Sequence, residues 1–262
     1  MAETKMNVQL LAHTQIHTDI LDEMLFGKIP HVKATDGQRV ALTAIRTCYS
    51  ANKPTEILAK EGAKYFGSKA SDGGAGTDAD RLFRHIFASK HTSTLEHISF
   101  TFAIEGVSRA LLAQLTRHRV GFSFSVQSQR YVRMGRDDRS GGFDYVMPPT
   151  VTEDKKVDHS PSLDFTHYIS AVDHFGDAME MIQDVYDELR SLGVPAEDAR
   201  AVLPNAAATN LVMTANLTAL LSFYSKRKKG RGAQSEITEL AEALRREVVD
   251  VEPWVEVFFD EI

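Results

Sequence analysis

The sequence has very little cysteine and no long hydrophobic run. Its single cysteine, Cys48, excludes an intrachain disulfide and a metal site built from several thiolates. No segment reaches the length of a membrane-spanning helix, and Met1–Ala12 contains no apolar run of signal-peptide length. These absences predict a cytoplasmic protein.

Positive charge is also in deficit. The 262 residues include 30 Lys plus Arg against 36 Asp plus Glu, a net charge of −6 at pH 7. A chain with this balance does not adhere as a whole to nucleic acid or anionic membranes, so an anionic ligand must be bound by a local group of cations. With 43% hydrophobic residues the chain can bury a full core, and one domain over residues 1–262 is expected.

One stretch concentrates the groups that bind phosphate. Arg117–Tyr131 contains three arginines, one histidine and three serines. The planar guanidinium of arginine matches phosphate bidentately, and serine hydroxyls add neutral donors. A helix expected from about residue 107 would place Gln114 and Arg117 on one face, directed at a shared ligand. The stretch therefore predicts a nucleotide site.

Hydrophobic periodicity predicts a mixed chain whose second half is mostly helical. Asp78 or Asp80 is expected to cap the helix that begins there, and Gly193 to end the longest helix. Strands are expected at residues 6–13, 97–104 and 143–147, and helices at 38–49, 78–90, 165–189, 195–226 with an interruption near Pro204, and 233–249. Surface loops are expected at about 53–77 and 135–161.

Three patterns that could carry chemistry have simpler interpretations. Gly73–Gly76 lacks the lysine of a phosphate loop and indicates a surface loop. His91, Glu96 and His97 do not have metalloprotease spacing, so hydrogen bonding is favoured over metal binding. Cys48 has no evident general base beside it in the sequence and is interpreted as a buried, inert thiol.

A second basic cluster, Lys226–Arg231, ends a helix that carries Asn216, Thr218 and Ser222 at helical spacing. Exposed polarity of a helix would also explain these three side chains. The clusters Arg117–Arg139 and Lys226–Arg231 leave open an alternative function, a nucleic-acid-binding protein.

Several motifs together resemble one family. Arg117-His118-Arg119, followed by Ser128-Gln129-Arg130-Tyr131, resembles the RHR-x7-S signature of the flavin-dependent thymidylate synthases, the ThyX family. The resemblance covers about residues 40–255, and further matches follow in order at Ser93–His97 with Phe100–Phe102, Ala199–Pro204, and Asn216 through Arg227 to Gln234. It implies an α/β (α+β) fold with a central, mostly antiparallel sheet flanked by long helices.

The resemblance also implies roles for individual residues. FAD, whose pyrophosphate needs cationic donors, would be held by His91, Ser93, Arg117, His118, Arg119, Asn216, Thr218 and Ser222. The nucleotide dUMP would be bound by Gln114, Arg117, Ser128, Gln129, Arg130, Arg200 and Arg227. Arg227 resembles the family's catalytic arginine, which lies against the pyrimidine and favours its ionisation at N3.

The implied reaction is the methylation of dUMP to dTMP for dTTP biosynthesis. The carbon donor would be 5,10-methylenetetrahydrofolate, and NADPH would reduce the FAD that delivers the hydride. The family is a homotetramer with active sites shared between subunits, and it uses no metal. Another flavin or nucleotide enzyme on the same scaffold is a further alternative.

The chain departs from the family signature at one place. Eight residues, Val120–Gln127, lie between Arg119 and Ser128 where the family usually has seven. Val126 therefore stands where the family often has Glu or Gln. A bulge in this segment would allow Gln127 to take that role, because one inserted residue redirects those that follow it.

Overall fold

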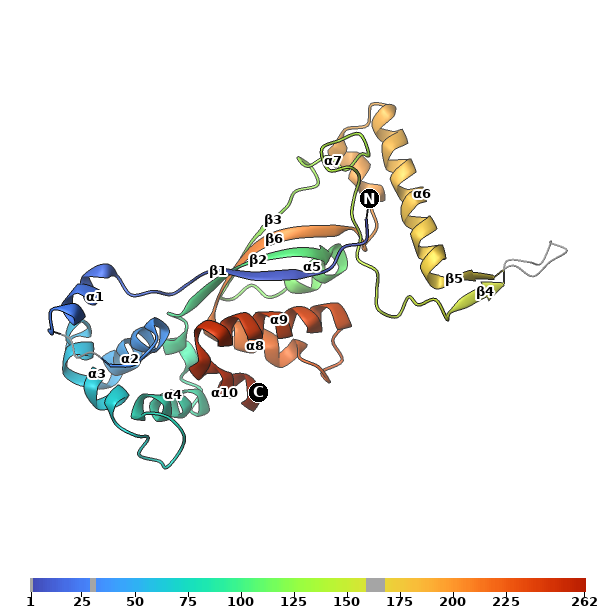
Figure 1. The fold of residues 1–262 in the computed structure, drawn as a ribbon. Coiled ribbons are helices and arrows are strands. Elements are labelled where there is room, and N and C mark those ends of the chain that lie inside the picture. The colour runs from blue at the N-terminus through green and yellow to red at the C-terminus, as the bar shows by residue number, and fades with distance from the viewer. Residues whose placement is uncertain (1, 29–31, 159–167) are drawn as a thin grey trace.

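The computed structural model describes residues 2–28, 32–158 and 168–262. Its centre is a four-stranded antiparallel sheet with the order β1, β2, β6, β3 (Figure 1). The strands are β1 (Asn7–His13), β2 (Ser99–Ser108), β3 (Phe122–Val126) and β6 (Ala208–Asn216). The expected fold class, a central antiparallel sheet flanked by long helices, is confirmed.

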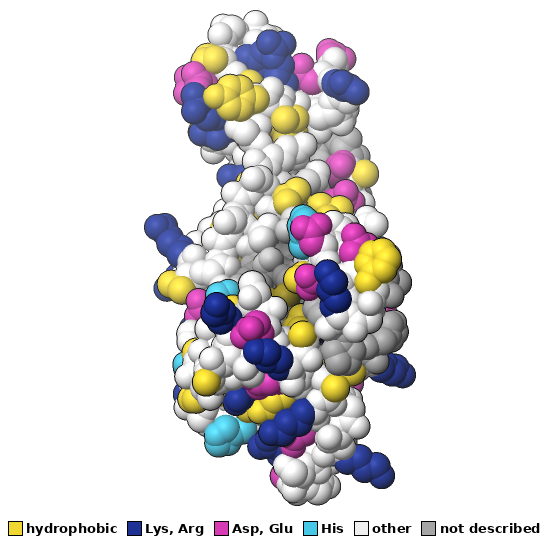
Figure 2. Space-filling model, turned by 90° about the vertical axis from the view of Figure 1, so that its left-hand side faces the viewer, with side chains coloured by type: hydrophobic (Ala, Val, Ile, Leu, Met, Phe, Trp, Pro, Cys, Tyr) yellow, Lys and Arg dark blue, Asp and Glu magenta, His cyan; other side chains and the backbone are white. Residues whose placement is uncertain are grey.

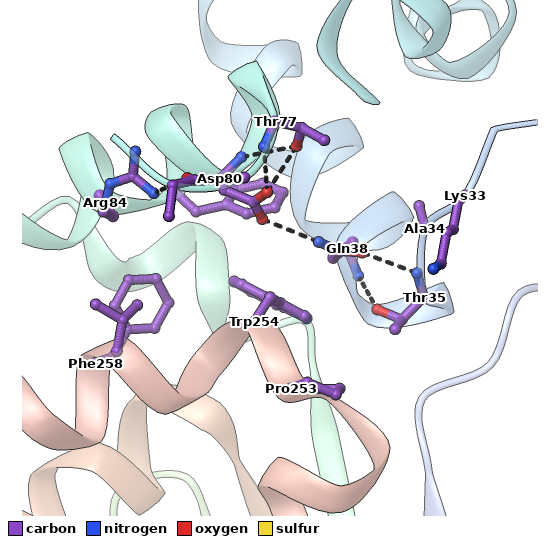
Figure 3. A pocket seen from close by; sticks show the side chains of 14 residues that line it. Lys33, Ala34, Thr35, Gln38, Thr77, Asp80, Arg84, Pro253, Trp254 and Phe258 are labelled. Carbon is purple, nitrogen blue, oxygen red and sulfur yellow. Dashed lines mark hydrogen bonds between the residues drawn. The ribbon is translucent and has the colours of Figure 1, made fainter. Parts of the chain in front are cut away.

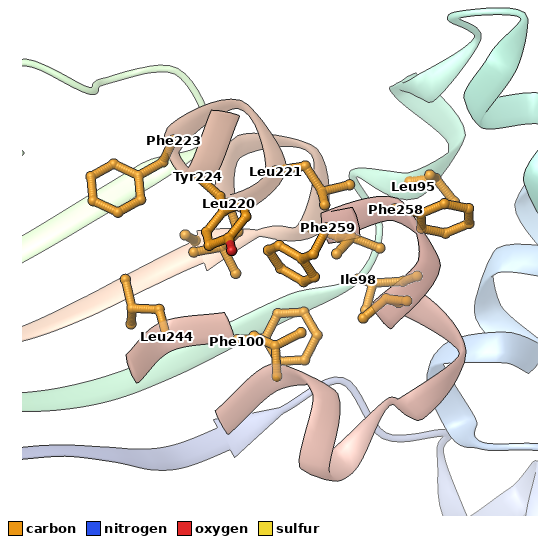
Figure 4. Packing of buried hydrophobic residues seen from close by; sticks show 14 of the residues in the cluster. Leu95, Ile98, Phe100, Leu220, Leu221, Phe223, Tyr224, Leu244, Phe258 and Phe259 are labelled. Atoms are coloured by element: carbon orange, nitrogen blue, oxygen red, sulfur yellow. The ribbon is translucent and has the colours of Figure 1, made fainter. Parts of the chain in front are cut away.

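The main core lies between one face of this sheet and the C-terminal helices. Alternate residues of β2, among them Phe100, Phe102 and Ile104, are fully buried on that face, as the two-residue period of a strand requires. They pack against α5 (Arg109–Leu115), α8 (Leu217–Arg227), α9 (Ser235–Val251) and α10 (Glu256–Glu261) (Figure 4). In the described chain no helix covers the opposite face, where Ser123, Ser125 and Val212 are exposed (Figure 1).

The N-terminal third forms a group of helices beside the sheet. It contains α1 (Thr18–Leu25), α2 (Asp36–Tyr49), η1 (Pro54–Glu56), α3 (Ile57–Gly67), α4 (Asp78–Ala88) and η2 (Thr92–Leu95). On the face of the molecule nearest this group, acidic and basic side chains are interspersed without a large area of one sign (Figure 2). This surface agrees with the expectation that anion binding is local.

The expected loop at residues 53–77 is wrong for its first part. Residues 57–67 form α3, with Ile57, Tyr65 and Phe66 buried while Lys60 and Lys64 face solvent. Only residues 68–77 are irregular. The cap of α4 also differs from the expectation: Thr77 is the N-cap, and its hydroxyl accepts a hydrogen bond from the Asp80 backbone N–H at 3.3 Å.

The N-terminal helices and the C-terminal segment meet around a cavity of about 610 Å³ (Figure 3). Gln38 Nε2 donates to Asp80 Oδ1 at 3.1 Å on one side of it. Trp254, in η4 (Pro253–Val255), and Phe258 supply the apolar side. The Gln38 and Asp80 side chains bond to each other and to the backbone N–H groups of the caps Thr35 and Thr77. The hydrogen bonds of these two polar side chains are thus made within the fold.

The longest helix, α6 (Ala171–Ser191), packs on a second hydrophobic cluster that includes Met134, Phe143, Met179 and Tyr186. It begins later than the expected residue 165. Ile169 lies in the short strand β5 (Tyr168–Ser170), which pairs with β4 (Lys156–Asp158). Phe165 and residues 159–161 of the expected surface loop lie outside the described residues. The strand expected at 143–147 is reduced to isolated bridges at Tyr145.

The largest error of the sequence prediction is at residues 195–226. This segment is not an interrupted helix: it forms α7 (Ala196–Ala199), η3 (Arg200–Val202), the central strand β6 and then α8. In β6, Thr209, Leu211, Met213 and Ala215 are buried and alternate with more exposed residues. That alternation is the period of a strand, and pairing with β2 and β3 on both sides fixes it.

No helix in the described part of the chain has the length and apolar character needed to cross a membrane.

Candidate functional site

The Arg117-His118-Arg119 segment forms a tight turn between α5 and β3. Gly121, with φ of +74°, closes the turn, and its carbonyl accepts a hydrogen bond from the Asn216 backbone N–H at 3.1 Å. A Cβ atom at position 121 would lie 2.7 Å from both Ala219 Cβ and Asn216 Nδ2. The turn is therefore pressed against the start of α8. Arg117 and Arg119 remain exposed and available to a ligand.

His118 and Arg227 form the centre of this region. Arg227 Nε donates to His118 Nε2 at 3.3 Å. The imidazole packs edge-on against Phe223, with ring centroids 5.0 Å apart. Burial lowers the pKa of His118, and the charges of Arg227, Lys226 and Arg117 lower it further. The ring is therefore neutral at pH 7, with its proton on Nδ1 because Nε2 acts as the acceptor.

The first residues of α8 connect this turn to the N-terminal helices. Asn216 caps α8, its side-chain oxygen accepting from the Ala219 backbone N–H at 2.8 Å. Thr218 Oγ1 donates to the Thr92 carbonyl at 2.8 Å, which fixes η2 against α8. Ser222 lies further along the helix and is exposed. Asn216 and Thr218, both expected to bind FAD, thus also make hydrogen bonds that stabilise the fold.

His91 and Ser93, also expected to bind FAD, line a cavity of about 820 Å³ between α1, α2, α3 and η2. His91 Nδ1 lies 2.7 Å from the Tyr49 hydroxyl. Cys48 also lines this cavity and is exposed, so the expectation of a buried thiol is wrong. Cys48 lies on the side of α2 that faces the cavity, and its Sγ donates to the Ala44 carbonyl at 3.7 Å.

The residues expected to bind dUMP fall into two groups. Gln114, Arg117 and Arg227 lie with the turn or close to it, and Gln114 Nε2 donates to Gln234 Oε1 at 2.5 Å. The second group, Ser128, Gln129, Arg130 and Arg200, lies beyond the far end of β3, next to α7 and η3 (Figure 1).

In this second group, Arg130 forms an ion pair with Glu197 at 3.0 Å. Gln129 and Arg200 line a cavity of about 610 Å³ together with Arg109, which sequence reasoning did not identify. The only signal for Arg109 was its place at the start of the helix that leads to Gln114.

One chain does not bring the two groups together. The turn at Arg117–Gly121 precedes β3, and Ser128–Arg130 follows it. The five residues of β3, at about 3.3 Å each, separate the two groups by about 17 Å. Each chain therefore presents two separate clusters of cationic and amide groups.

The extra residue in Val120–Gln127 does not produce a bulge in β3. Residues 122–126 pair one to one with residues 215–211 of β6, without a shift in register. Val126 packs against the main core, and Gln127 Oε1 accepts a hydrogen bond from Asn210 Nδ2 at 3.4 Å. The expected bulge is therefore wrong. Gln127 instead continues the alternation of Ser123 and Ser125 on the open face of the sheet.

Metal binding has no evident place in this arrangement. Within residues 2–28, 32–158 and 168–262, no three His, Cys, Asp or Glu side chains are grouped so that they could hold a metal ion. His97 is exposed and lies just before β2 rather than at its first residue. The functional groups of the two clusters are guanidinium, amide, imidazole and hydroxyl groups.

Arginine and amide side chains are clustered at both ends of β3, and the guanidinium fork of arginine matches the geometry of a phosphate group. Residues 32–254 match the family described as thymidylate synthase complementing protein. The flavin-dependent thymidylate synthase of Geobacter sulfurreducens is 37% identical over 220 residues, which cover 84% of this chain and 81% of that protein. The enzyme of the same name from Clostridium tetani is 33% identical, over 82% of this chain and 79% of that protein.

The fold has a solved counterpart. The crystal structure of a UMP/dUMP methylase, PolB, from Streptomyces cacaoi bound with 5-Br dUMP superposes with a TM-score of 0.68 at 20% identity, covering 100% of this chain and 97% of that chain. This chain belongs to the flavin-dependent thymidylate synthase family. It is thus an FAD-dependent enzyme, and nothing in the comparisons supports the nucleic-acid-binding alternative.

Proposed function

We propose that this protein converts dUMP to dTMP, with 5,10-methylenetetrahydrofolate as the carbon donor and NADPH as the source of electrons for FAD. The observation that carries the proposal is the Arg117–Gly121 turn. Its two exposed arginines stand beside the neutral His118 and the Arg227 guanidinium, on a chain whose residues 32–254 match the family. The cytoplasm is the proposed location, and residues 1–262 the proposed functional domain.

The residues of the turn fit the demands of FAD. Arg117 and Arg119 are exposed and offer guanidinium forks to a pyrophosphate. His118, neutral with its proton on Nδ1, accepts from Arg227 through Nε2. Asn216, Thr218, Ser222, His91 and Ser93 would supply the remaining polar contacts. When bound and reduced, FAD supplies the hydride that completes the methyl group.

Arg227 is the proposed catalytic residue. Its Nε is held by His118, which leaves the Nη atoms of the guanidinium to face the nucleotide. A fixed positive charge against the pyrimidine stabilises negative charge that develops on the ring at N3, and it raises electron density at C5. Because the geometry is set before substrate binds, little reorganisation is needed during the reaction.

A site shared between subunits explains why one chain holds two separated clusters. Closed symmetric oligomers place the same surface of several copies around common axes, so the cluster beside Arg227 of one subunit can meet the cluster beside Arg200 of another. The open sheet face with Ser123, Ser125 and Val212 offers a surface for such contacts. A homotetramer is the proposed assembly.

The direct test is turnover by the purified protein. We expect flavin absorption at about 450 nm after reconstitution with FAD, and formation of dTMP that depends on both NADPH and methylenetetrahydrofolate. Arg227→Ala should abolish dTMP formation while Cys48→Ala should retain it, because the mechanism is electrostatic and uses no thiol. A folded Cys48→Ala variant that binds FAD but makes no dTMP would contradict the proposal.

Subunit sharing can be tested by mixing two inactive variants. If Arg227→Ala damages one cluster and Arg200→Ala the other, random mixed oligomers at a 1:1 ratio should contain about a quarter of sites with no lesion. We expect recovery of about that fraction of activity after co-expression. Mixed oligomers verified by mass spectrometry that show no recovery would refute the shared site.

A further inference from the structure

The basic cluster Lys226–Arg231 is used only in part by the proposed function. It holds five cations in six residues, on a chain with a net charge of −6, and a role has been assigned to Arg227 alone. The side chains of Lys226, Lys229 and Arg231 are exposed. Their charges are thus left without an explanation from the fold or from the reaction.

The loop that connects α8 to α9, residues 228–234, borders the proposed nucleotide site at both ends (Figure 1). It begins directly after Arg227, the proposed catalytic residue. It ends at Gln234, whose Oε1 accepts from Gln114 Nε2 at 2.5 Å, and Gln114 is expected to bind dUMP. A Cβ atom at Gly230 would meet no atom of the described structure within 4 Å, so the middle of the loop is open to solvent. The cations of the loop therefore lie at the rim of the site, where a ligand can reach them.

No carboxylate in the described part of the chain balances these exposed cations. Lys226, Lys229 and Arg231 form no ion pair there, and residues 226–235 contain no Asp or Glu. The next carboxylate along the chain, Glu236, accepts from the backbone N–H and the hydroxyl of Ser108, at 2.7 and 2.5 Å. The loop thus presents positive charge that the fold leaves uncompensated.

The positive charge of the loop continues to the Arg117–Gly121 turn. After burial, the charges of Arg227, Lys226 and Arg117 are the next causes that lower the pKa of His118, so the end of α8 and the turn act on one point. Neighbouring charges of one sign raise the local concentration of the opposite ion. Under the proposed function the pyrophosphate of FAD is bound by the arginines of the turn, which leaves the loop free for a second anion.

The exposed lysines favour a flexible polycarboxylate over a compact phosphate. A lysine ammonium is a strongly hydrated point charge on a flexible stem, and an exposed one pairs only weakly with a single anion. Several weak pairs along one ligand reinforce each other. Among the reactants of the proposed reaction only the folate carries carboxylates, on the glutamate end opposite the ring that donates the carbon. Because that ring must reach the pyrimidine beside Arg227, the glutamate end leaves the site across its rim.

We propose that Lys229 and Arg231, with Lys226, form a binding surface for the glutamate carboxylates of the folate co-substrate. The proposal rests on the proposed function, because the folate is a reactant of the methylation. It makes the loop 228–234 a determinant of co-substrate selectivity: a folate with several γ-linked glutamates binds more tightly than one with a single glutamate. The pairs are exposed, so this selectivity weakens as salt screens them.

The test uses methylenetetrahydrofolate with a single glutamate and with a pentaglutamate tail as co-substrates of the FAD-loaded enzyme, at saturating dUMP and NADPH. At low salt we expect the KM of the pentaglutamate form to be lower by about fivefold to tenfold, since one exposed pair changes an equilibrium by at most about fivefold. In Lys229→Gln/Arg231→Gln the ratio of the two KM values should fall below about threefold, while kcat and FAD content change by less than about twofold.

Lys156→Gln/Arg246→Gln is the matched control. It removes the same two charges, one lysine and one arginine, from exposed positions of β4 and α9. The net charge of the two double variants is therefore equal, and the control should keep the wild-type ratio of KM values at every salt concentration.

The outcomes separate the two proposals. A wild-type holoenzyme that forms no dTMP with either folate would overturn the proposed function itself. Equal KM values for the two folates in the wild type, or a ratio that Lys229→Gln/Arg231→Gln leaves intact, would overturn only the role of the loop. The 2′-phosphate of NADPH is the competing anion. If the variant raises the KM of NADPH but not of NADH in flavin reduction and keeps the folate ratio, the loop binds that phosphate and the folate assignment is wrong.

Discussion

Gln183 is expected to be among the most sensitive positions in the protein, because it joins α6 to the segment that follows Ser128–Arg130, the residues proposed to bind the nucleotide. Its side chain is fully buried. Oε1 accepts from the Phe143 backbone N–H at 2.9 Å, and Nε2 donates to the Met134 carbonyl at 2.9 Å and to Asp187 Oδ1 at 3.1 Å. Met134 lies four residues beyond Arg130, so this contact also positions the segment that carries Ser128–Arg130.

Gln183→Leu fills a similar volume and removes all three hydrogen bonds. It leaves one backbone N–H and one backbone carbonyl buried without a partner, and each costs about 1–3 kcal/mol. We expect the free energy of unfolding to fall by about 2–6 kcal/mol, with a smaller loss if water reaches the site. The Phe143 amide should exchange faster with solvent, and the affinity for dUMP should fall.

The assay is denaturant unfolding at one fixed protein concentration, because the stability of an oligomer depends on concentration. Met181→Leu, at an exposed position of the same helix, is the control and should change stability by less than about 0.5 kcal/mol. A loss below about 1 kcal/mol in Gln183→Leu, with normal protection of the Phe143 amide, would refute the reasoning.

Three further predictions concern the turn and α4. The pKa of His118 lies below its ordinary value of 6.5, so its contribution to stability is present above pH 6.5 and is lost as the pH falls through the folded-state pKa; His118→Asn should flatten this part of the stability-pH profile. The Arg81 guanidinium holds the pKa of Asp78 well below its ordinary 3.8, so Asp78→Asn should lower the free energy of unfolding by about 1–2 kcal/mol at pH 7, measured by thermal unfolding. The stability difference between wild type and variant should shrink as the pH falls below 3.8, because the wild-type carboxylate becomes protonated. Gly121→Ala should destabilise by about 1–3 kcal/mol and lower the FAD content after purification, since the new Cβ meets α8 and the positive φ is strained; normal FAD content would contradict the proposed place of the turn.

The turn and the end of α8 were assigned to one site from the sequence, and the structure places them side by side, whereas the sheet was predicted less well. The Arg117-His118-Arg119 signature and the basic end of α8 are adjacent in the structure through the His118–Arg227 hydrogen bond. The strand β6 was missed because Ala208–Asn216 is bordered by helical sequence, and its extended state depends on pairing with β2 and β3. Helix α3 was missed because its few apolar residues, of which Ile57, Tyr65 and Phe66 are buried, stand in a polar stretch.

Arg109 shows a different limit of sequence reasoning. Its partners Gln129 and Arg200 are 20 and 91 positions away in the chain, and only the order of the sheet brings the three together. The irregular segment after β3 and the one before β6 meet beside the start of α5 because β3 and β6 pair antiparallel. Spacing along the sequence carries no record of that arrangement.

The partly buried arginines of this acidic chain fall into two groups, those that form an ion pair with a carboxylate and those that do not. Carboxylates outnumber cations, 36 to 30, so a partly buried arginine has ample opportunity to find a counterion. The partly buried arginines that form ion pairs are Arg39, Arg46, Arg81, Arg84 and Arg245. Within the described residues Arg109, Arg190, Arg200 and Arg227 are partly buried and form no ion pair, although Arg190 donates to the Val194 carbonyl and Arg200 to the Glu197 carbonyl. Because burying an uncompensated charge is unfavourable, we propose that an anionic ligand balances the charges of Arg200 and Arg227.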